Sequence, residues 1–582
     1  RRSGYQNVTV GPFEGLNLDK NPLAVGKNEL RVAEEIARRD SWVGTRPAAA
    51  KLGSGEDYEN QITVGGTGRA IQGAVEYRKD FDEGRRLIVV AHNSTANRKI
   101  WYDDGNQLPA ISAGTITTNA DYIWSFGIHN NLLWGTGGPA GRSQVNTESI
   151  WTWDGNIGTG AQEAALTNKS DGARLRPKFV RAWRNYVMVN GLQTTGASNS
   201  FSNNPMVTRF ATFSEDPTDN AKWLDGNTIG FAATGSSIFE RAGLDSYGGA
   251  YSTGFGDYQD NEGDFLLLLS NVGITSVSLD PVNDFRVTDT IPNGCVHERA
   301  FVNLGLDSGD AVYVSESGVH SLRQSQMFGG KADTYLSWKI RDFWKTLNRA
   351  RLPFTCGAYD RENGRVVFAF TVGADTAHTV LYCLDVKGVA NELNSQNARW
   401  YGPWRIRADA TGSTYKMVNH LAYLRDASDN WWLYVFTTDG NVLRFDNDAY
   451  MDLNANGYAP VMQTRDFVFG DLVAEKRVGD AIITTGGATS DYSISISTVF
   501  DFGRRKNTTG LQMKGSGQTL VDALVGSKVS TSFATGSDKV YLTGRGRAIG
   551  LEFSHGSRNQ PFYIGAASLR VAGAGEDIGD PS

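Results

Sequence analysis

At 582 residues the chain is several times longer than a usual domain, so we expect one large repeat-built body accompanied by smaller modules. Aromatic residues make up 11% of the sequence and 67 glycines punctuate it, a mixture that favours many short strands and tight turns over helical bundles. A net charge of −6 argues against a protein that grips nucleic acid over its whole surface, although a channel wall past which DNA slides is still permitted.

Cysteine usage and hydropathy argue against further classes. Cys295, Cys356 and Cys383 are too few and too scattered for a disulfide framework or a four-ligand zinc site, so we expect buried reduced thiols. The sequence shows no apolar run long enough to span a membrane and no signal-like opening segment. Neither a membrane span nor export through a signal peptide is therefore expected.

Residues 1–57 are predicted to form an N-terminal arm with one short helix at 28–38. In that helix acidic residues alternate with Leu30, Ala33 and Ile36, and the segment closes with the pair Arg46-Pro47, which favours extended geometry. The arm carries more apolar bulk than a solvated tail would, including Phe13, Leu16 and Trp42. We expect it to dock on a partner or on the C-terminal domain, so that deleting residues 1–27 leaves a folded propeller that no longer assembles.

Residues 58–460 are predicted to form a β-propeller of six to eight blades. Short apolar runs recur in pairs joined by Asn, Asp and Gly turns, which is the pattern of β-hairpins. The seven pairs are 87–91 with 99–102, 131–134 with 150–153, 186–189 with 207–213, 265–270 with 275–279, 311–314 with 318–322, 365–370 with 380–384, and 431–437 with 442–445. Such spacing fits four-stranded blades whose radial closure hides strand edges, whereas paired sandwiches, the alternative, do not demand so regular a unit.

Two further elements complete the predicted all-β fold. A helix is expected at 331–351 on the outside of a blade, because apolar residues recur there at spacings of three and four. The residues of this stripe are Leu336, Ile340, Phe343, Trp344 and Leu347. Residues 461–582, where alternating runs are separated by Gly, Ser and Thr clusters, are predicted to form a C-terminal β-sandwich.

Several fragments of the sequence carry a resemblance through their order along the chain. They are 13–17, 21–23 and Arg46-Pro47 in the arm, Ser214-Glu215-Asp216-Pro217 with Trp223, residues 294–299, 312–315 and 318–322 in the middle, and 544–548 with 551–553 near the end. Together they resemble the packaged-DNA stabilisation and tail hub, or nozzle, proteins of short-tailed bacteriophages. The Ser- and Asn-rich stretch 191–204 departs from that pattern.

This resemblance implies a structural protein of the virion tail. Its expected form is a homo-oligomeric ring, a hexamer, that ends the DNA ejection conduit, contacts tail adaptor and tail fibre proteins, and lets double-stranded DNA pass. In such a ring a few arginines repeated by symmetry form a charged collar. The candidate channel or interface residues are Arg545 and Arg547, expected on one strand face, with Arg504, Arg505, Lys506, Phe13, Leu16 and Trp42.

The alternative function is a carbohydrate-binding or glycan-cleaving propeller that recognises a receptor. It is motivated by the aromatic groups Trp431-Trp432 and Trp400-Tyr401-Trp404, which inward packing explains better. The repeated Ser-x-Asp-x-Gly-x-Thr-Trp turns of a sialidase-like enzyme are missing from the sequence. We therefore expect no catalytic residues and no cofactor.

Metal sites are not expected either. The seven histidines show neither H-x-x-x-H nor H-E-x-x-H spacing. Residues 452–457 place oxygen ligands at positions one, three and five and a glycine at six, as calcium loops do, but position twelve is Gln463 instead of a bidentate Glu. A turn between propeller and sandwich is therefore favoured over a calcium site.

Overall fold

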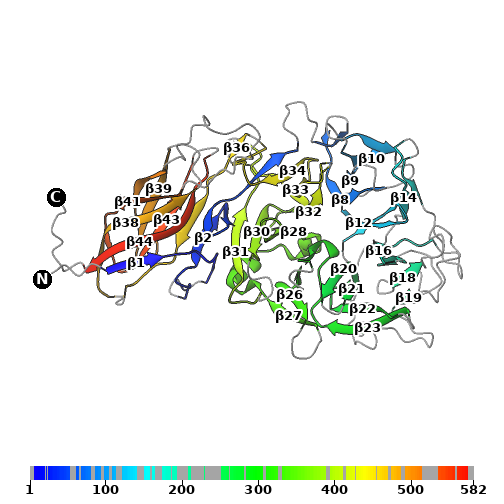
Figure 1. The fold of residues 1–582 in the computed structure, drawn as a ribbon, viewed down its shortest axis with the longest axis horizontal. Coiled ribbons are helices and arrows are strands. Elements are labelled where there is room, and N and C mark those ends of the chain that lie inside the picture. The colour runs from blue at the N-terminus through cyan, green and yellow to red at the C-terminus, as the bar shows by residue number, and fades with distance from the viewer. Residues whose placement is uncertain are drawn as a thin grey trace, which may run out of the picture.

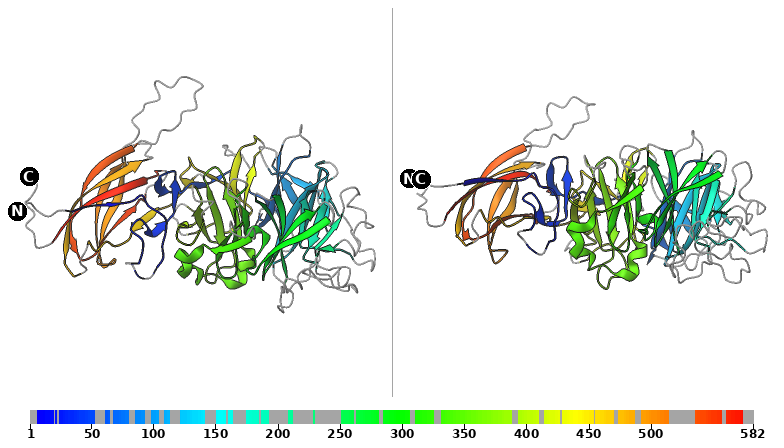
Figure 2. Two further views of the ribbon diagram at one scale, coloured as in Figure 1. Left: turned by 60° about the horizontal axis from the view of Figure 1, so that its bottom comes forward. Right: turned by 90° about the horizontal axis from the view of Figure 1, so that it is seen from below.

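The computed structural model describes residues 6–573, with gaps of which the longer ones are 53–60, 113–120, 141–149, 164–173, 193–207, 212–227, 230–250 and 514–534. The described residues form many antiparallel strands and only short helical segments, so the predicted all-β class is confirmed. Two bodies lie side by side, a propeller and a sandwich, with N-terminal strands between them (Figure 1, Figure 2). The motif at 214–217 with Trp223, and most of the stretch 191–204, lie outside the described residues.

The described residues of the propeller form seven four-stranded units, here called blades 1 to 7, of which one is part of a nine-stranded sheet. Blades 1 to 3 contain β8 (Ile71–Tyr77), β9 (Arg86–Ala91), β10 (Arg98–Tyr102) and β11 (Ala110–Ser112); β12 (Tyr122–His129), β13 (Leu132–Pro139), β14 (Trp151–Trp153) and β15 (Gln162–Glu163); and β16 (Phe179–Trp183), β17 (Tyr186–Asn190), β18 (Thr208–Ala211) and β19 (Thr228–Ile229). Blades 4 and 5 contain β20 (Ser252–Asp260), β21 (Gly263–Ser270), β22 (Ile274–Asp280) and β23 (Asp284–Ile291); and β24 (Phe301–Asn303), β25 (Asp310–Val314), β26 (Val319–Gln324) and β27 (Lys331–Tyr335).

Blades 6 and 7 complete the circle. They contain β28 (Cys356–Asp360), β29 (Arg365–Phe370), β30 (Val380–Asp385) and β31 (Arg399–Trp404); and β32 (Val418–Arg425), β33 (Trp431–Thr437), β34 (Val442–Asp446) and β5 (Ala48–Lys51). The first strand of each blade contacts the first strand of the next, and β32 contacts β8, so the ring of blades is closed. The outermost strand of blade 7 comes from the N-terminal segment, since β5 pairs with β34.

All seven predicted hairpins are present. The second and third strands of every blade pair in antiparallel register within the predicted runs, for example Leu133 opposite Trp153 and Val367 opposite Cys383. Inward-facing aromatic and β-branched residues of these strands fill the spaces between neighbouring blades. The three cysteines are buried and free, as expected.

The sandwich contains two sheets whose inner faces share one core. One sheet has the order β3 (Ile36–Arg39), β4 (Trp42–Thr45), β44 (Tyr563–Gly573), β38 (Lys476–Gly486) and β41 (Thr535–Tyr541), with β1 (Gln6–Val10) on β44 and β42 (Arg545–Gly546) on β38. The other has the order β2 (Leu30–Glu34), β37 (Val461–Thr464), β43 (Ile549–Ser554), β39 (Tyr492–Phe500) and β40 (Arg505–Met513). Two small ladders, β6 (Thr63–Val64) with β7 (Thr67–Gly68) and β35 (Met451–Asp452) with β36 (Asn456–Gly457), accompany the blades.

The N-terminal segment is shared between the two bodies and is not a separate arm. β1, β3 and β4 belong to one sandwich sheet, and β5 belongs to blade 7. β2 joins blade 6 to the second sandwich sheet, because Ala33 pairs with both Gly402 of β31 and Met462 of β37. A single nine-stranded sheet therefore runs from the propeller into the sandwich.

The helix predicted at 28–38 is wrong, because this segment forms β2 and β3. The two strands are separated by Glu35, whose positive φ of 55° turns the chain. A register shift between Leu30 and Val32 brings both Leu30 and Ala33 into the core. The apolar spacing that indicated a helix therefore arises from an irregular strand followed by a turn.

The helix predicted at 331–351 is also wrong in its extent. Its first residues form β27, which blade 5 requires as its fourth strand. Short helical segments follow, η3 (Ser337–Ile340), α2 (Arg341–Trp344) and η4 (Arg349–Phe354). The predicted apolar stripe is nevertheless buried, because Leu336, Ile340, Phe343, Trp344 and Leu347 all pack into the main core.

Candidate functional sites

The axis of the propeller is closed by η2 (Glu298–Ala300), which leads into blade 5. Nε of Arg299 donates to Nδ1 of His420 on β32 at 2.9 Å, and Nη1 donates to the backbone oxygen of Gln72 on β8 at 3.3 Å. Oε2 of Glu298 accepts the backbone N–H of Phe255 on β20 at 3.1 Å. These two neighbouring residues thus bridge blades 1, 4, 5 and 7, in the fragment 294–299 that the sequence singled out.

A cavity of about 330 Å³ lies beside this bridge. Its lining comes from the first strands of six blades and from η2, and it includes Trp124, Phe126, Phe255, Phe301, Asn303 and Glu298. Arg181 and Asp257 form an ion pair there, and their side chains are 35% and 42% exposed, so the cavity is open to solvent. Burial raises the pKa of the Glu298 carboxyl, against the influence of nearby Arg181 and Arg299.

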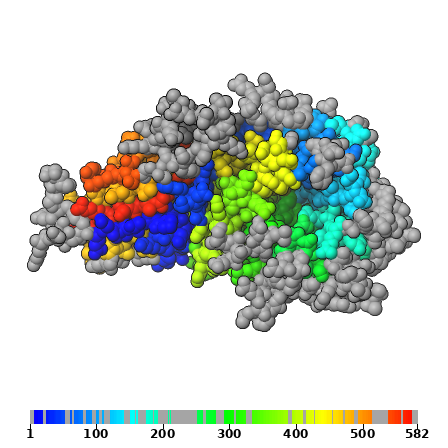
Figure 3. All heavy atoms as spheres, viewed as in Figure 1, coloured from blue at the N-terminus to red at the C-terminus, as the bar shows by residue number. Residues whose placement is uncertain are grey.

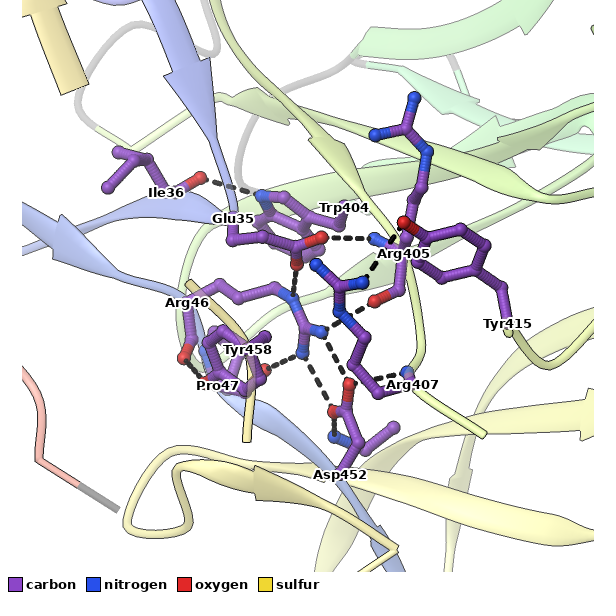
Figure 4. Close-up of polar contacts among 11 residues, drawn as sticks. Glu35, Ile36, Arg46, Pro47, Trp404, Arg405, Arg407, Tyr415, Asp452 and Tyr458 are labelled. Carbon is purple, nitrogen blue, oxygen red and sulfur yellow. Dashed lines mark hydrogen bonds and ion pairs between the residues drawn. The ribbon is translucent and has the colours of Figure 1, made fainter. Parts of the chain in front are cut away.

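A buried cluster of charges, here called the junction clamp, connects propeller and sandwich (Figure 4). The guanidinium of Arg46 is fully buried and donates to both oxygens of Asp452, from Nη2 at 2.7 Å and from Nη1 at 3.0 Å. Its Nε donates to Oε2 of Glu35. The ring of Tyr458 lies 4.0 Å from the guanidinium carbon, and its hydroxyl donates to the backbone oxygen of Arg46 at 2.6 Å.

The clamp also fixes the backbone of the propeller at the junction. Oε1 of Glu35 accepts the N–H of Arg405, just after β31, and Asp452 accepts the N–H of Ala49 and of Arg407, each bond measuring 2.9 Å. Although burial opposes the charge, Asp452 and Glu35 hold the pKa of Arg46 well above its usual range. Burial raises the pKa of Glu35 in spite of Arg46. The role of the clamp is structural, since its polar groups satisfy one another.

The described residues of the oxygen-rich fragment 452–457 form a turn, as favoured by the sequence. β35 and β36 pair within it, and the carboxylate of Asp452 binds Arg46 in place of a calcium ion. Across the described part of the chain, no group of three or more His, Cys, Asp or Glu side chains is arranged to hold a metal ion. Within the same part, no helix has the length and apolar character needed to cross a membrane.

Four of the predicted basic residues meet at one exposed end of the sandwich. Nη2 of Arg505 donates to Oδ2 of Asp501 at 2.6 Å and to the backbone oxygen of Arg545 at 2.8 Å, 40 residues away in the chain. Oδ1 of Asp501 accepts the N–H of Arg547 at 2.7 Å. Arg504 lies in the same turn, after Asp501. Arg545 and Arg547 are both exposed, on either side of buried Gly546, but β42 ends at Gly546, so Arg547 lies in the bend after the strand and not on the strand face expected for it.

A fifth arginine, Arg477, was missed by the sequence analysis. It is exposed on β38 and lies directly opposite Arg545 on β42. Like charges opposite each other destabilise a ladder unless an anion is near. We name Arg477, Arg504, Arg505, Arg545 and Arg547 the basic tip; among the described residues, Arg505 alone of these five forms an ion pair. The predicted Lys506 forms an ion pair with Glu552 and therefore adds little positive charge to the basic tip.

The apolar candidates of the N-terminal segment lie inside the subunit. Phe13 and Leu16 are 4% and 1% exposed, so they are not available to a partner, and the N–H of Leu16 donates to the oxygen of Trp400 at 2.7 Å. Trp42 is half-buried and packs over Gly565 of β44. This segment therefore docks on its own sandwich and on blade 6, where Figure 3 shows it beside the C-terminal strands.

The aromatic groups that motivated the carbohydrate alternative divide into two kinds. Trp400, Tyr401 and Trp404 are fully buried, as inward packing predicts. Trp431 is 40% exposed and stacks on Tyr423 with ring centroids 5.0 Å apart.

Comparisons with known proteins give fold neighbours alone. No protein-family model matches the sequence, and no curated protein matches it. Among the similar solved structures are a protein from Lactobacillus plantarum (12% identity, 65% of this chain and 99% of that chain, TM-score 0.30) and the exo-beta-1,3-galactanase of Phanerochaete chrysosporium (10% identity, 82% and 99%, TM-score 0.25). The N-terminal domain of Nup159 is similar at 9% identity over 71% of this chain and 98% of that one, with a TM-score of 0.33. Likenesses this low carry no argument about function.

Proposed function

We propose that the protein is a structural subunit of a bacteriophage tail that assembles into a ring, with six copies expected, around the path of the DNA. The basic tip carries this proposal, because five arginines from three segments converge on one exposed end of the sandwich. A ring repeats that tip once per subunit, which makes a circle of positive charge attractive to phosphates. The net charge of −6 keeps the remaining surface from holding the same polyanion.

The stiff connection between the two bodies supports a mechanical role. The nine-stranded sheet and the junction clamp fix the propeller to the sandwich through backbone hydrogen bonds and buried ion pairs. A subunit that links a tail adaptor to tail fibres has to transmit force without bending at its domain boundary. In this proposal the protein acts in the virion tail as a building block and performs no chemistry.

The closed axis of the propeller supports a path for DNA outside the propeller. Glu298 and Arg299 cross the axis, and the cavity beside them measures about 330 Å³, which is far too small for a duplex. DNA therefore passes outside each propeller, through the central opening that the ring of subunits encloses.

Native mass spectrometry of the full chain at micromolar concentration tests the proposal. A closed ring, with six copies the expected number, supports it, whereas a stable monomer contradicts it. Electron cryomicroscopy of the ring then tests the role of the basic tip. The tip is expected at the inner wall, and a position on the outer rim would separate it from the DNA.

A further inference from the structure

The central cavity is not used by the proposed structural function. It lies at the axis, where the first strands of six blades converge, and its ion pair of Arg181 and Asp257 is partly exposed. Its volume of about 330 Å³ falls within the range of roughly 300–1,000 Å³ that is usual for small-molecule sites. The cavity is therefore large enough and accessible enough to hold a ligand.

The charges that line the cavity are balanced. Arg181 is bound to Asp257, with Nε 3.1 Å from Oδ1. Arg299 donates its N–H groups to His420 and to the backbone oxygens of Gln72 and Asn419. Neither cation is left to attract an anion, and the two carboxylates are matched by the two guanidinium groups.

The uncharged part of the lining favours a ligand with one apolar face and several hydroxyl groups. Phe126 and Phe301, which are partly exposed, supply aromatic surface, while Trp124 and Phe255 are buried behind them. The carboxylate oxygens of Glu298 and Asp257 keep lone pairs beyond those used by Phe255, Ser125 and Arg181, so they are able to accept hydroxyl protons. The side chain of Asn303 lines the same cavity, and its Oδ1 accepts the N–H of Gly305 at 2.8 Å, which leaves its amide group as the donor end.

We infer that this cavity binds a neutral pyranose unit of a glycan, with a C–H face against the aromatic side chains and hydroxyl groups on Asp257, Glu298 and Asn303. The inference goes beyond the proposed structural function and does not depend on the ring. It also places glycan recognition at the axis and not at the exposed Trp431.

Saturation-transfer-difference NMR on the full chain tests this inference. The probes are methyl β-D-galactopyranoside, methyl α-D-glucopyranoside, methyl α-D-mannopyranoside and N-acetylglucosamine, with glucuronate and glucosamine as charged comparisons. At least one neutral probe is expected to bind. Phe126→Ala, which removes an aromatic wall, and Asp257→Asn, which keeps the shape of the side chain, are each expected to weaken that binding about tenfold or more.

Trp431→Ala is the matched control, because it removes an aromatic side chain outside the cavity. It is expected to leave binding unchanged, and melting curves identify any variant that fails to fold. The inference is overturned if no neutral probe binds at millimolar concentration, if a charged probe binds more tightly, or if Trp431→Ala abolishes binding while both cavity variants retain it. Because the number of subunits is measured in a separate experiment, failure of the glycan inference is distinguishable from failure of the structural proposal.

Discussion

Arg46 and Asp452 are 406 residues apart in the chain, yet they share two parallel hydrogen bonds of 2.7 and 3.0 Å in the interior. Paired bonds of this geometry are among the strongest that side chains form. Because Asp452 also accepts the N–H groups of Ala49 and Arg407, this one contact organises the backbone where propeller and sandwich meet.

Removal of Arg46 is expected to destabilise the protein strongly. In Arg46→Ala the carboxylates of Glu35 and Asp452 stay buried without their cation, which costs about 3–5 kcal/mol of the free energy of unfolding. Arg46→Lys keeps the charge but loses the paired bonds, so its free energy of unfolding should fall between those of the wild-type protein and Arg46→Ala. Urea unfolding at pH 7 measures these effects.

The control for this prediction is Arg341→Ala. Arg341 pairs with Asp19 near the surface, where both side chains are partly exposed. The loss of such a pair is expected to cost less than about 1 kcal/mol. Equal losses for the Arg46 and Arg341 variants would show that the clamp does not stabilise the junction.

Acid is expected to weaken the protein through His420. Burial, with the Arg299 cation beside it, holds the pKa of His420 well below its usual range, and its Nδ1 accepts a hydrogen bond from Arg299. In the unfolded chain this ring gains a proton as the pH falls through about 6.5, while the folded protein keeps it neutral. Protonation of this ring in the unfolded chain therefore lowers the free energy of unfolding by about 1.4 kcal/mol at pH 5.5 and leaves it unchanged at pH 8.

His420→Gln keeps an acceptor for Arg299 and removes the titration. The difference in free energy of unfolding between pH 7.5 and pH 5.5 should shrink by about the amount given by linkage, ~1.4 kcal/mol. Between pH 7.5 and 8.5 the variant and the parent should run parallel, which serves as the internal control. An unchanged acid slope in the variant would mean that His420 takes a proton in the folded protein.

Any side chain at Gly15 is expected to destabilise the protein. Its φ is 98°, and a Cβ atom there would lie 2.9 Å from the backbone nitrogen of Trp400. Gly305 has a similar φ of 87° with no atom within 4 Å of a built Cβ, so Gly305→Ala measures the backbone cost alone, about 1–2 kcal/mol. Gly15→Ala should lose a further ~1–3 kcal/mol from overpacking against blade 6. Equal losses in thermal or urea unfolding would argue that this segment is held loosely.

Neutralising the basic tip is expected to weaken binding of duplex DNA. A variant with Gln at Arg477, Arg545 and Arg547 loses up to three phosphate contacts per engaged subunit, and each contact contributes about 0.9 to the slope of log affinity against log salt. Fluorescence anisotropy over a salt series measures this slope. The control carries Gln at Arg184, Lys345 and Lys387, which are exposed on the propeller and give the same net charge. If both variants bind DNA equally, overall charge and not the tip controls the binding.

The sequence predicted the parts of the fold that local pattern determines. Every predicted hairpin joins runs close in the chain, where alternation and turn residues are sufficient evidence. The pairings of β5 with β34 and of β1 with β44 could not be found in this way, because no local feature of Ala48–Lys51 or Gln6–Val10 identifies a partner hundreds of residues away.

The candidate sites show the same division. Two basic clusters were visible in the sequence, but Arg477 stands alone and joins them only through its register opposite Arg545. The fragment 452–457 resembled a calcium loop because a carboxylate in a turn suits any cation, and the cation here is the side chain of Arg46. The central cavity is built by strands from six blades, so no contiguous motif could indicate it.

Closure of the propeller by β5, and of the sandwich sheet by β1 on β44, has a consequence for biosynthesis. During translation β5 has no strand partner until β34 has been made, and β1 has none until β44 has been made. Contacts of such long sequence separation form late and slowly. A nascent chain that stops before β34 therefore keeps an open blade, one that stops before β44 keeps an unpaired sheet edge, and only a chain translated through β44 completes both bodies.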